Sequence, residues 1–188
     1  FYVDHDPAVA AQCLVDKHVV KMILESAQLL STAHRVLDGE LRVSQRLVPG
    51  TLENPKYRKH KSWILNDIRH GNMYQATHIN HPSAVWCRSS VENYLWLVEH
   101  FFALCDEYKH RYNKVHKCFD MGYYLQSPPK NLQEYDWTPM PSAMADEYKI
   151  SEDPCTNYRN YYINGKQHLH KWTNREIPTW MISGTTAS

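Results

Sequence analysis

Apolar residues near the start of the chain recur at the spacing of a helix. Val15, Val19, Ile23 and Ala27 fall four positions apart, which places their side chains on one face of a helix. The pattern predicts a long helix over about residues 7–37 with Gly39 as its stop, or a pair of helices broken near Val15 or Asp16.

A second apolar series begins at Val91 and Leu95 and continues at helical spacing. Ser89 precedes Glu92 by three positions, and such a pair is typical of the capping box that starts a helix. We therefore expect a second long helix over about residues 83–112.

Asp-Pro pairs mark the start of two helices. Asp caps the N-terminus of a helix, and Pro favours the first helical position. One pair stands at 6–7, and the other, at 153–154, opens an aromatic and basic helix over about residues 154–164 that Gly165 closes.

The segment between the first two helices is polar and shows no convincing alternation of the kind that marks a β-hairpin. We expect residues 40–61 to form an irregular basic loop with a turn at Pro49-Gly50, and residues 63–68 to form a short helix. The sequence therefore predicts a mainly α fold, a single compact helical domain over residues 1–188 with long irregular loops.

The composition is that of a globular protein. Of the 188 residues, 43% are hydrophobic and 22% are charged, which excludes a disordered chain. The net charge of +1 gives no global field that marks a nucleic-acid binder. No apolar run approaches the roughly 18–20 residues of a membrane span, and residues 1–11 lack the basic start of a signal peptide. We expect a cytoplasmic protein with no membrane association.

The cysteines indicate a reducing environment. Their number is odd and no two form a Cys-x-x-Cys motif, so neither a disulfide framework nor a zinc knuckle is predicted. Cys13 and Cys105 lie in apolar helical contexts, and we expect both to be buried thiols. The full set is Cys13, Cys87, Cys105, Cys118 and Cys155.

Ionisable residues gather on the polar side of the first predicted helix. Asp16, His18, Lys21 and Glu25 follow one another closely, and the last three share one face. An acid, a base and an amine on a rigid element are what proton transfer or imine chemistry needs, so these four are our candidate catalytic residues. The alternative is a solvated surface, on which a Lys21–Glu25 pair contributes only tenths of a kcal/mol.

A basic run with an interleaved aromatic residue lies in the predicted loop. Lys56, Tyr57, Arg58, Lys59 and Lys61 combine cations for phosphates with a ring that can stack on a base. Because the chain as a whole is nearly neutral, positive charge is concentrated here. We expect these residues to bind nucleic acid; the alternative is an ordinary exposed loop.

Arg159, Tyr162 and Lys166 are further candidates for binding nucleic acid. They belong to an aromatic and basic stretch near the C-terminus, part of which must enter the core. The alternative is that all three serve packing.

Several histidines raise the question of a metal site. His78 and His81 could supply ligands together with His110 or His116, but no His-Glu-x-x-His motif is present. A capping or supporting role accounts for these histidines better. We therefore expect neither a catalytic metal nor a cofactor.

Three pieces of the chain resemble one known family. The triplet at 16–18, with Glu25 seven residues after its histidine, is similar to the start of the phage pyrimidine-dimer DNA glycosylases of the endonuclease V type. Residues 81–107 resemble the long central helix of that family, and residues 158–165 resemble its aromatic C-terminal stretch. The phrase DKHVVKMILESAQLL also looks like proteins encoded in phage genomes, including related families that process DNA bases.

The resemblance implies a compact helical glycosylase with linked lyase activity, in which an amine attacks the sugar C1′ and Glu25 handles protons. In that family the amine is the α-amine of the N-terminal residue. Since this sequence opens with the bulky Phe1, we expect the amine to come either from the true N-terminal residue or from Lys17 or Lys21, if burial lowers its pKa.

Three functional hypotheses follow. The first is a monomeric DNA-repair enzyme that excises a damaged or modified pyrimidine from duplex DNA flipped or kinked at the target, in the host cytoplasm if it is phage-encoded. The second is a phage transferase that modifies a DNA base without cutting the strand. The third is a non-enzymatic helical module that binds a partner protein.

Overall fold

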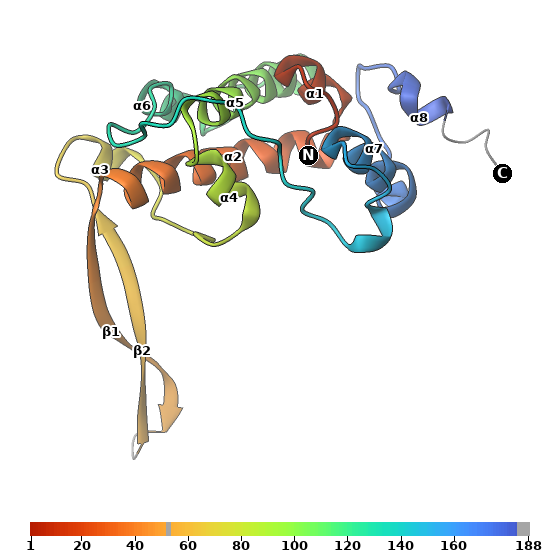
Figure 1. Ribbon diagram of the computed structural model, residues 1–188. Helices are drawn as coiled ribbons and strands as arrows, with labels where there is room; N and C mark the ends of the chain where they lie inside the picture. Colours follow the sequence, from red (N-terminus) through yellow and green to blue (C-terminus); the bar gives the residue numbers. More distant parts are fainter. Residues whose placement is uncertain (52–53, 184–188) are drawn as a thin grey trace.

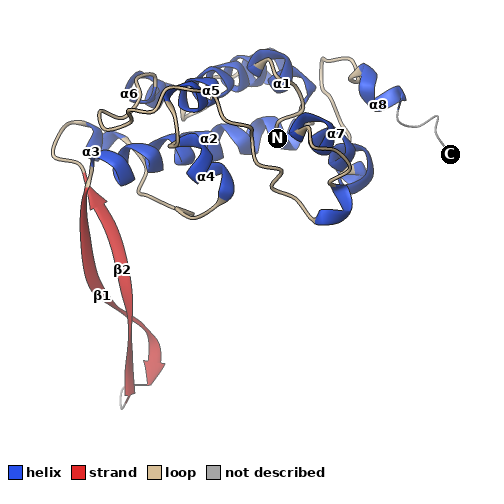
Figure 2. Ribbon diagram, viewed as in Figure 1, coloured by secondary structure: helices blue, strands red, loops and turns tan. Residues whose placement is uncertain are grey.

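Two long helices form the centre of the structure, a computed structural model that describes residues 1–51 and 54–183. Helix α2 (Asp16–Asp38) packs against α5 (Val91–Tyr112), and α1 (Pro7–Cys13) also packs on α5. A two-stranded hairpin projects from this helical body (Figure 1, Figure 2). The prediction of a mainly α fold is confirmed.

The other elements are arranged around the central pair of helices. Helices α4 and α6 each contact both α2 and α5. Helix α7 lies at the end of the body where the N-terminus also lies (Figure 1). The remaining bounds are β1 Glu40–Thr51, β2 Asn54–Ile64, α3 Arg69–Asn72, α4 Pro82–Cys87, α6 Gly122–Leu125, α7 Pro154–Gly165 and α8 Thr179–Ser183.

The first helical stretch is a pair of helices, which was one of the two forms that the sequence predicted. Asp6 caps α1 by accepting the backbone N–H groups of Ala8 and Val9 at 2.8 and 3.0 Å. The chain turns at Leu14 and enters α2 after Val15. This turn allows both helices to pack against α5.

Gly39 ends α2, as predicted, and the reason is steric. Its N–H donates to the carbonyl oxygen of Arg35 at 2.9 Å. A Cβ at this position would collide with that oxygen and would lie 3.1 Å from the Cβ of Trp63. The close approach of the following strand therefore requires glycine here.

The segment that was expected to be an irregular loop is a β-hairpin, so this prediction was wrong. Strand β1 pairs antiparallel with β2, with Leu41 opposite Trp63 and Leu47 opposite Tyr57. The short helix expected at 63–68 is also absent there, because β2 continues to Ile64. Positions 52–53 of the predicted loop lie outside the described residues.

The hairpin escaped detection because neither of its faces is buried. Leu41, Val43 and Leu47 do alternate with polar residues, but their side chains are 48–61% exposed. The facing strand offers mainly basic residues. A strand without a buried face lacks the clean period of two that reveals a half-buried strand.

The second long helix begins later than the sequence suggested. The span 83–112 is divided into α4 and α5, and Ser90, not Ser89, caps α5 by accepting the N–H of Asn93 at 3.2 Å. The side-chain amide of Asn93 donates to the carbonyl oxygen of Trp86 at 2.9 Å. This bond satisfies a carbonyl at the end of α4 and so stabilises the break.

The third predicted helix is confirmed. Helix α7 extends one residue beyond the predicted end, and Asp153 caps it by accepting the N–H groups of Cys155 and Thr156 at 3.1 and 3.0 Å. Asp and Pro at this start therefore act as the local pattern indicated.

The cysteines are free thiols, as the sequence indicated. Cys105 is buried, whereas Cys13 is only half-buried. Within the described part of the chain, no helix combines the length and the apolar character that a membrane crossing requires.

A buried guanidinium joins α2 to the hairpin and to the segment after it. The side chain of Arg35 is fully buried. It donates to the carbonyl oxygens of Trp63 at 2.9 Å, His70 at 2.8 Å, Met73 at 3.0 Å and Tyr74 at 2.5 Å. One planar group with five donors thus fixes four backbone positions that are far from it in sequence.

Replacing Arg35 with Met should lower the free energy of unfolding by about 3 to 5 kcal/mol, because several buried carbonyl groups lose their donors. Urea unfolding followed by circular dichroism measures the change. Arg42→Met, at an exposed position of β1, serves as the control and should stay within about 0.5 kcal/mol of the parent. A loss below about 1 kcal/mol for Arg35→Met would contradict this account.

Candidate active site

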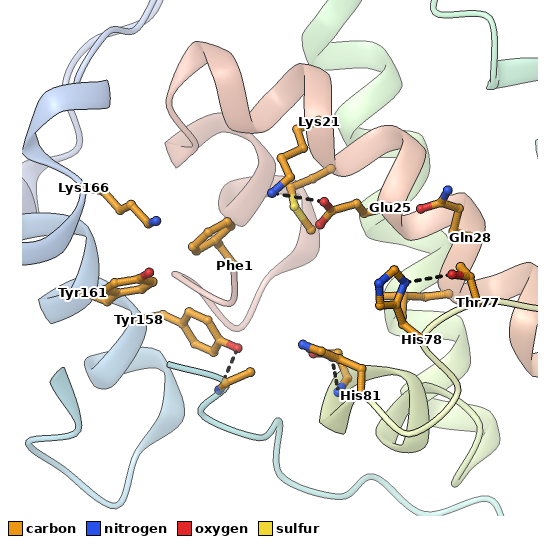
Figure 3. A pocket seen from close by; sticks show the side chains of 14 residues that line it. Phe1, Lys21, Glu25, Gln28, Thr77, His78, His81, Tyr158, Tyr161 and Lys166 are labelled. Atoms are coloured by element: carbon orange, nitrogen blue, oxygen red, sulfur yellow. Dashed lines mark hydrogen bonds and ion pairs between the residues drawn. The ribbon is translucent and has the colours of Figure 1, made fainter. Parts of the chain in front are cut away.

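A pocket of about 430 Å³ lies between α2, the segment before α4, and α7 (Figure 3). It is open to solvent and combines charged, polar and aromatic side chains. Its lining consists of Phe1, Lys21, Met22, Glu25, Gln28, Leu29, Thr77, His78, His81, Ser83, Ala143, Tyr158, Tyr161 and Lys166.

Glu25 and Lys21 form the charged wall of the pocket. They stand one helical turn apart on α2, and the Lys21 Nζ lies 3.1 Å from the Glu25 Oε1. The Lys21 side chain is 61% exposed and the Glu25 side chain is 39% exposed, so both remain accessible to a ligand. The sequence prediction that these two residues share a face is confirmed by this contact.

Phe1 lines the same pocket, where an α-amine on this residue would be a second amine. Burial lowers the pKa of the Phe1 α-amino group to about 6, the charge of Glu25 acts to raise it, and the charge of Lys21 acts to lower it. An amine with a pKa near neutrality is largely unprotonated at pH 7, and a nucleophilic amine needs its lone pair free.

His18 supports the pocket from behind and does not line it. Its ring stacks on Phe1 with 4.1 Å between the centroids and 12° between the planes. Its Nδ1 is hydrogen-bonded to the Tyr162 hydroxyl. Burial lowers the pKa of His18 to about 3, so the imidazole is neutral at pH 7.

The wall facing Glu25 comes from a segment that the sequence did not assign to the site. His78 has a left-handed backbone with φ 47°, which is uncommon for a residue with a side chain, and its Nδ1 lies 2.9 Å from the Thr77 Oγ1. His81 caps α4 through its Nδ1, which accepts the N–H of Ser83 at 3.2 Å. The prediction of a capping role is confirmed for His81, although both rings also face the pocket (Figure 3).

Helix α7 and the residues after it supply the aromatic wall. Lys166 lines the pocket, and its Nζ lies 4.8 Å from the centre of the Tyr161 ring. Tyr162, in contrast, is fully buried, so its side chain does not reach a groove. Arg159 anchors the N-terminal segment by donating to Asp4 at 3.0 Å and lies away from the pocket.

Asp16 lies outside the pocket, in a buried ionic network. Arg111 donates to Asp16 at 2.9 Å and to Glu107 at 2.7 Å. Thr173 donates its hydroxyl to Asp16 at 2.6 Å, and Arg175 pairs with Glu107 at 2.8 Å. These contacts hold the start of α2 against α5 and the C-terminal segment.

The basic residues proposed for nucleic-acid binding lie on the hairpin, away from the pocket. Their side chains are exposed along β2, and none of them lines the pocket. The residues concerned are Lys56, Tyr57, Arg58, Lys59 and Lys61.

Among the described residues, the one set of three ligand-type side chains that converge is His5, Asp153 and Cys155, with donor atoms within 4.8 Å of one another. Asp153 is engaged as the cap of α7, and burial raises the pKa of the Cys155 thiol to about 11, so this set is poorly suited to a metal. The histidines considered from the sequence, His78, His81, His110 and His116, form no such group within the described part of the chain.

A carboxylate next to an amine in a pocket with aromatic walls provides the groups that proton transfer and imine formation require. A family model described as pyrimidine dimer DNA glycosylase matches residues 1–120 of the chain. The protein therefore belongs to the pyrimidine dimer DNA glycosylase family. No curated protein and no solved structure matches the chain.

Membership of this family selects among the three functional hypotheses. The protein is a DNA-repair enzyme, a glycosylase that acts on damaged pyrimidines in DNA. The matched region contains Phe1, Lys21, Glu25 and the hairpin, whereas Tyr158, Tyr161 and Lys166 follow it. The aromatic wall therefore lies in the part of the chain that the family model does not cover.

Buried neutral histidines should make the stability of the enzyme depend on pH. Burial lowers the pKa of His18 to about 3, of His100 to about 3 and of His34 to about 4. Below about pH 6.5, the ordinary pKa of histidine, the unfolded chain binds more protons than the folded chain. The free energy of unfolding should therefore be fully retained above pH 6.5 and should fall as the pH decreases toward 4.

His18→Asn removes one of these groups and should reduce the loss of stability between pH 7 and pH 5 by on the order of 1–2 kcal/mol. Urea unfolding at a series of pH values measures it. His60→Asn, at an exposed position of β2, is the matched control and should follow the parent profile. Parallel profiles for the parent and His18→Asn would contradict the assignment of His18 as a buried neutral histidine.

Proposed function

We propose that the pocket binds the damaged pyrimidine nucleotide flipped out of duplex DNA, with Glu25 as general acid and base and an adjacent amine as nucleophile. The observation that carries this proposal is the position of the Glu25 carboxylate, 3.1 Å from the Lys21 Nζ, in an open pocket that Phe1 also lines. A flipped nucleotide is required because C1′ of a stacked nucleotide is out of reach.

The dimensions and walls of the pocket suit a nucleotide. A volume of about 430 Å³ lies in the usual range of small-molecule sites, about 300–1,000 Å³. Tyr161 and Phe1 offer ring faces for stacking. Gln28 and His78 offer hydrogen-bonding groups on the opposite side (Figure 3).

The reaction proceeds through an imine. The lone pair of the amine forms a bond to C1′, the glycosidic bond breaks with its electron pair going to the departing base, and that base takes up a proton. Glu25 accepts the proton released by the amine and returns it to the sugar ring oxygen as the ring opens to the imine.

Linked lyase activity follows from the same intermediate. The imine makes the C2′ proton acidic, a base removes it, and the bond from C3′ to its phosphate oxygen breaks with the electron pair leaving on the phosphate. Water then hydrolyses the imine and releases the amine. Glu25 is the carboxylate placed to carry these protons.

The Lys21 Nζ lies next to Glu25, and an α-amine on Phe1 would lie in the same pocket. Burial would lower the pKa of such an α-amine to about 6, which would favour its nucleophilic form at pH 7. Lys21, whose Nζ lies 3.1 Å from the Glu25 Oε1, is the second candidate. Lys17 is exposed and does not line the pocket.

The pocket is complete within one chain, which supports action as a monomer. Asp16 and His18 act in this proposal by holding α2 and Phe1 in place, whereas Lys166 and the basic residues of β2 bind phosphates. The free cysteines support a reducing compartment such as a cytoplasm, including that of a phage host.

Glu25→Gln should lower the single-turnover rate of base excision by about 10²–10⁴-fold, because the proton carrier is lost while the shape of the pocket is kept. The rate is measured on ultraviolet-irradiated duplex DNA under enzyme excess. Glu99→Gln, a matched change at an exposed position of α5, should leave it unchanged. Full activity of Glu25→Gln would exclude Glu25 as the acid and base.

Borohydride should trap a covalent adduct between the enzyme and irradiated or abasic duplex DNA, since reduction converts the imine into a stable amine. Mass mapping of the adduct identifies the reacting residue as Lys21 or the N-terminal residue. Lys21→Met should abolish trapping if Lys21 is the reacting amine and leave trapping intact if the N-terminal residue is. If cleavage proceeds and no adduct forms, the imine mechanism is wrong.

A further inference from the structure

The hairpin carries the positive charge of the molecule. Residues 40–64 contain six Lys and Arg against two Glu, a net charge of +4, whereas the whole chain has +1. The remainder of the chain therefore has a net charge of −3. A cationic arm on an otherwise acidic protein points to an anionic partner.

One face of the hairpin concentrates arginine and lysine from both strands. Successive residues of a strand point to opposite faces. In the pairing of β1 with β2, Arg46 lies opposite Arg58 and Val48 lies opposite Lys56. Arg42, four residues before Arg46, belongs to the same face. This basic face is therefore formed by Arg42, Arg46, Lys56 and Arg58.

The Arg46–Arg58 pair is the strongest indication that the basic face meets an anion. Like charges directly opposite each other destabilise a two-stranded sheet, and both side chains are exposed. Within the described residues, Arg42 has Glu40 at 3.9 Å, but neither Arg46 nor Arg58 forms an ion pair. Phosphate groups seated between these cations would turn the repulsion into binding.

The shape and length of the hairpin fit a groove of duplex DNA. A two-stranded ribbon is narrow enough to enter the major groove. Strand β2 has 11 residues and, at about 3.3 Å per residue, spans roughly 36 Å. This length is close to one turn of B-DNA, about 34 Å.

The distance between the pocket and the base of the hairpin can be compared with a length of duplex DNA. Between Glu25 and Gly39, α2 advances by 14 residues, which at about 1.5 Å per residue is roughly 21 Å, or about six base pairs. Figure 1 shows that the hairpin leaves the body on the side of α2 where α4 lies. The pocket is on that side too, because His81 and Ser83 line it.

We propose that the hairpin is a DNA-binding arm that lies along a groove of the duplex, about six base pairs from the flipped nucleotide, with its basic face against the phosphates. The inference rests on the proposed function, since it takes the pocket to hold that nucleotide. Arg42 and Arg46 enter the interface from β1. Lys59 and Lys61 lie on the other face and contact DNA less.

The test is the salt dependence of binding to a 30-base-pair duplex that contains a central abasic analogue, measured by fluorescence anisotropy. Replacing Arg42, Arg46 and Arg58 together with Gln should weaken binding at least tenfold. The slope of log Kd against log salt should fall by about 1 for each lost phosphate contact, or about 3 in total. All three side chains are exposed, so the variant should not unfold at a lower temperature than the parent.

A matched control removes the same charge elsewhere. Lys109, Lys114 and Lys117 are exposed around the end of α5, and their joint replacement with Gln should leave the slope unchanged. Shortening the duplex to about five base pairs on each side of the analogue should weaken parent binding and remove the difference between parent and hairpin variant. If the two triple replacements lower the slope of log Kd against log salt equally, the hairpin is not the DNA-binding arm.

The two proposals fail in distinguishable ways. The binding assay uses an abasic analogue, so it does not depend on base excision. If the salt slope depends on the hairpin arginines but the enzyme excises no base, the mechanism at Glu25 is wrong and the hairpin is still a DNA-binding arm. If the enzyme excises the base but replacing Arg42, Arg46 and Arg58 leaves the slope of log Kd against log salt unchanged, the hairpin is not a DNA-binding arm. The mechanism at Glu25 is then retained.

Discussion

The buried guanidinium of Arg35 is the interaction on which the arrangement of the molecule depends. Its donors meet the carbonyl oxygens of Trp63, His70, Met73 and Tyr74, so the end of β2 and the segment that leads toward His78 are fixed to the same point of α2. A lysine has three donors on a single nitrogen and no planar fork, so it could not reach all four carbonyl oxygens. Without this group, the base of the hairpin and the approach to the pocket would lose their common anchor.

Helix α2 organises function at both of its ends. Its first half carries Lys21 and Glu25 into the pocket, and its last turn, closed by Gly39, starts the hairpin. The ionic network of Asp16 with Arg111 fixes the start of the helix against α5. Because a helix is stiff, the spacing between the Glu25 carboxylate and the base of the hairpin is set by the number of residues between them.

The part of the site that could be predicted is the part that one helix supplies. Glu25 and Lys21 stand at a spacing of four, and any helix brings such residues together. Thr77, His78, Tyr158 and Tyr161 could not be found this way, because their approach depends on how α4 and α7 pack against α2. Tyr162 shows the converse: its neighbour Tyr161 lines the pocket, while Tyr162 itself turns into the core.

The sequence by itself determined α1, α2 and α7, the Asp caps of α1 and α7, the glycine stop at Gly39 and the pairing of Lys21 with Glu25, since these features depend on contacts between residues a few positions apart. Tertiary structure alone decided the hairpin, whose apolar residues Leu41, Val43 and Leu47 alternate but stay exposed, and the register that sets Arg46 against Arg58. It also decided the aromatic wall of the pocket. These features depend on contacts between distant segments, and a local pattern carries no information about which distant segment will approach.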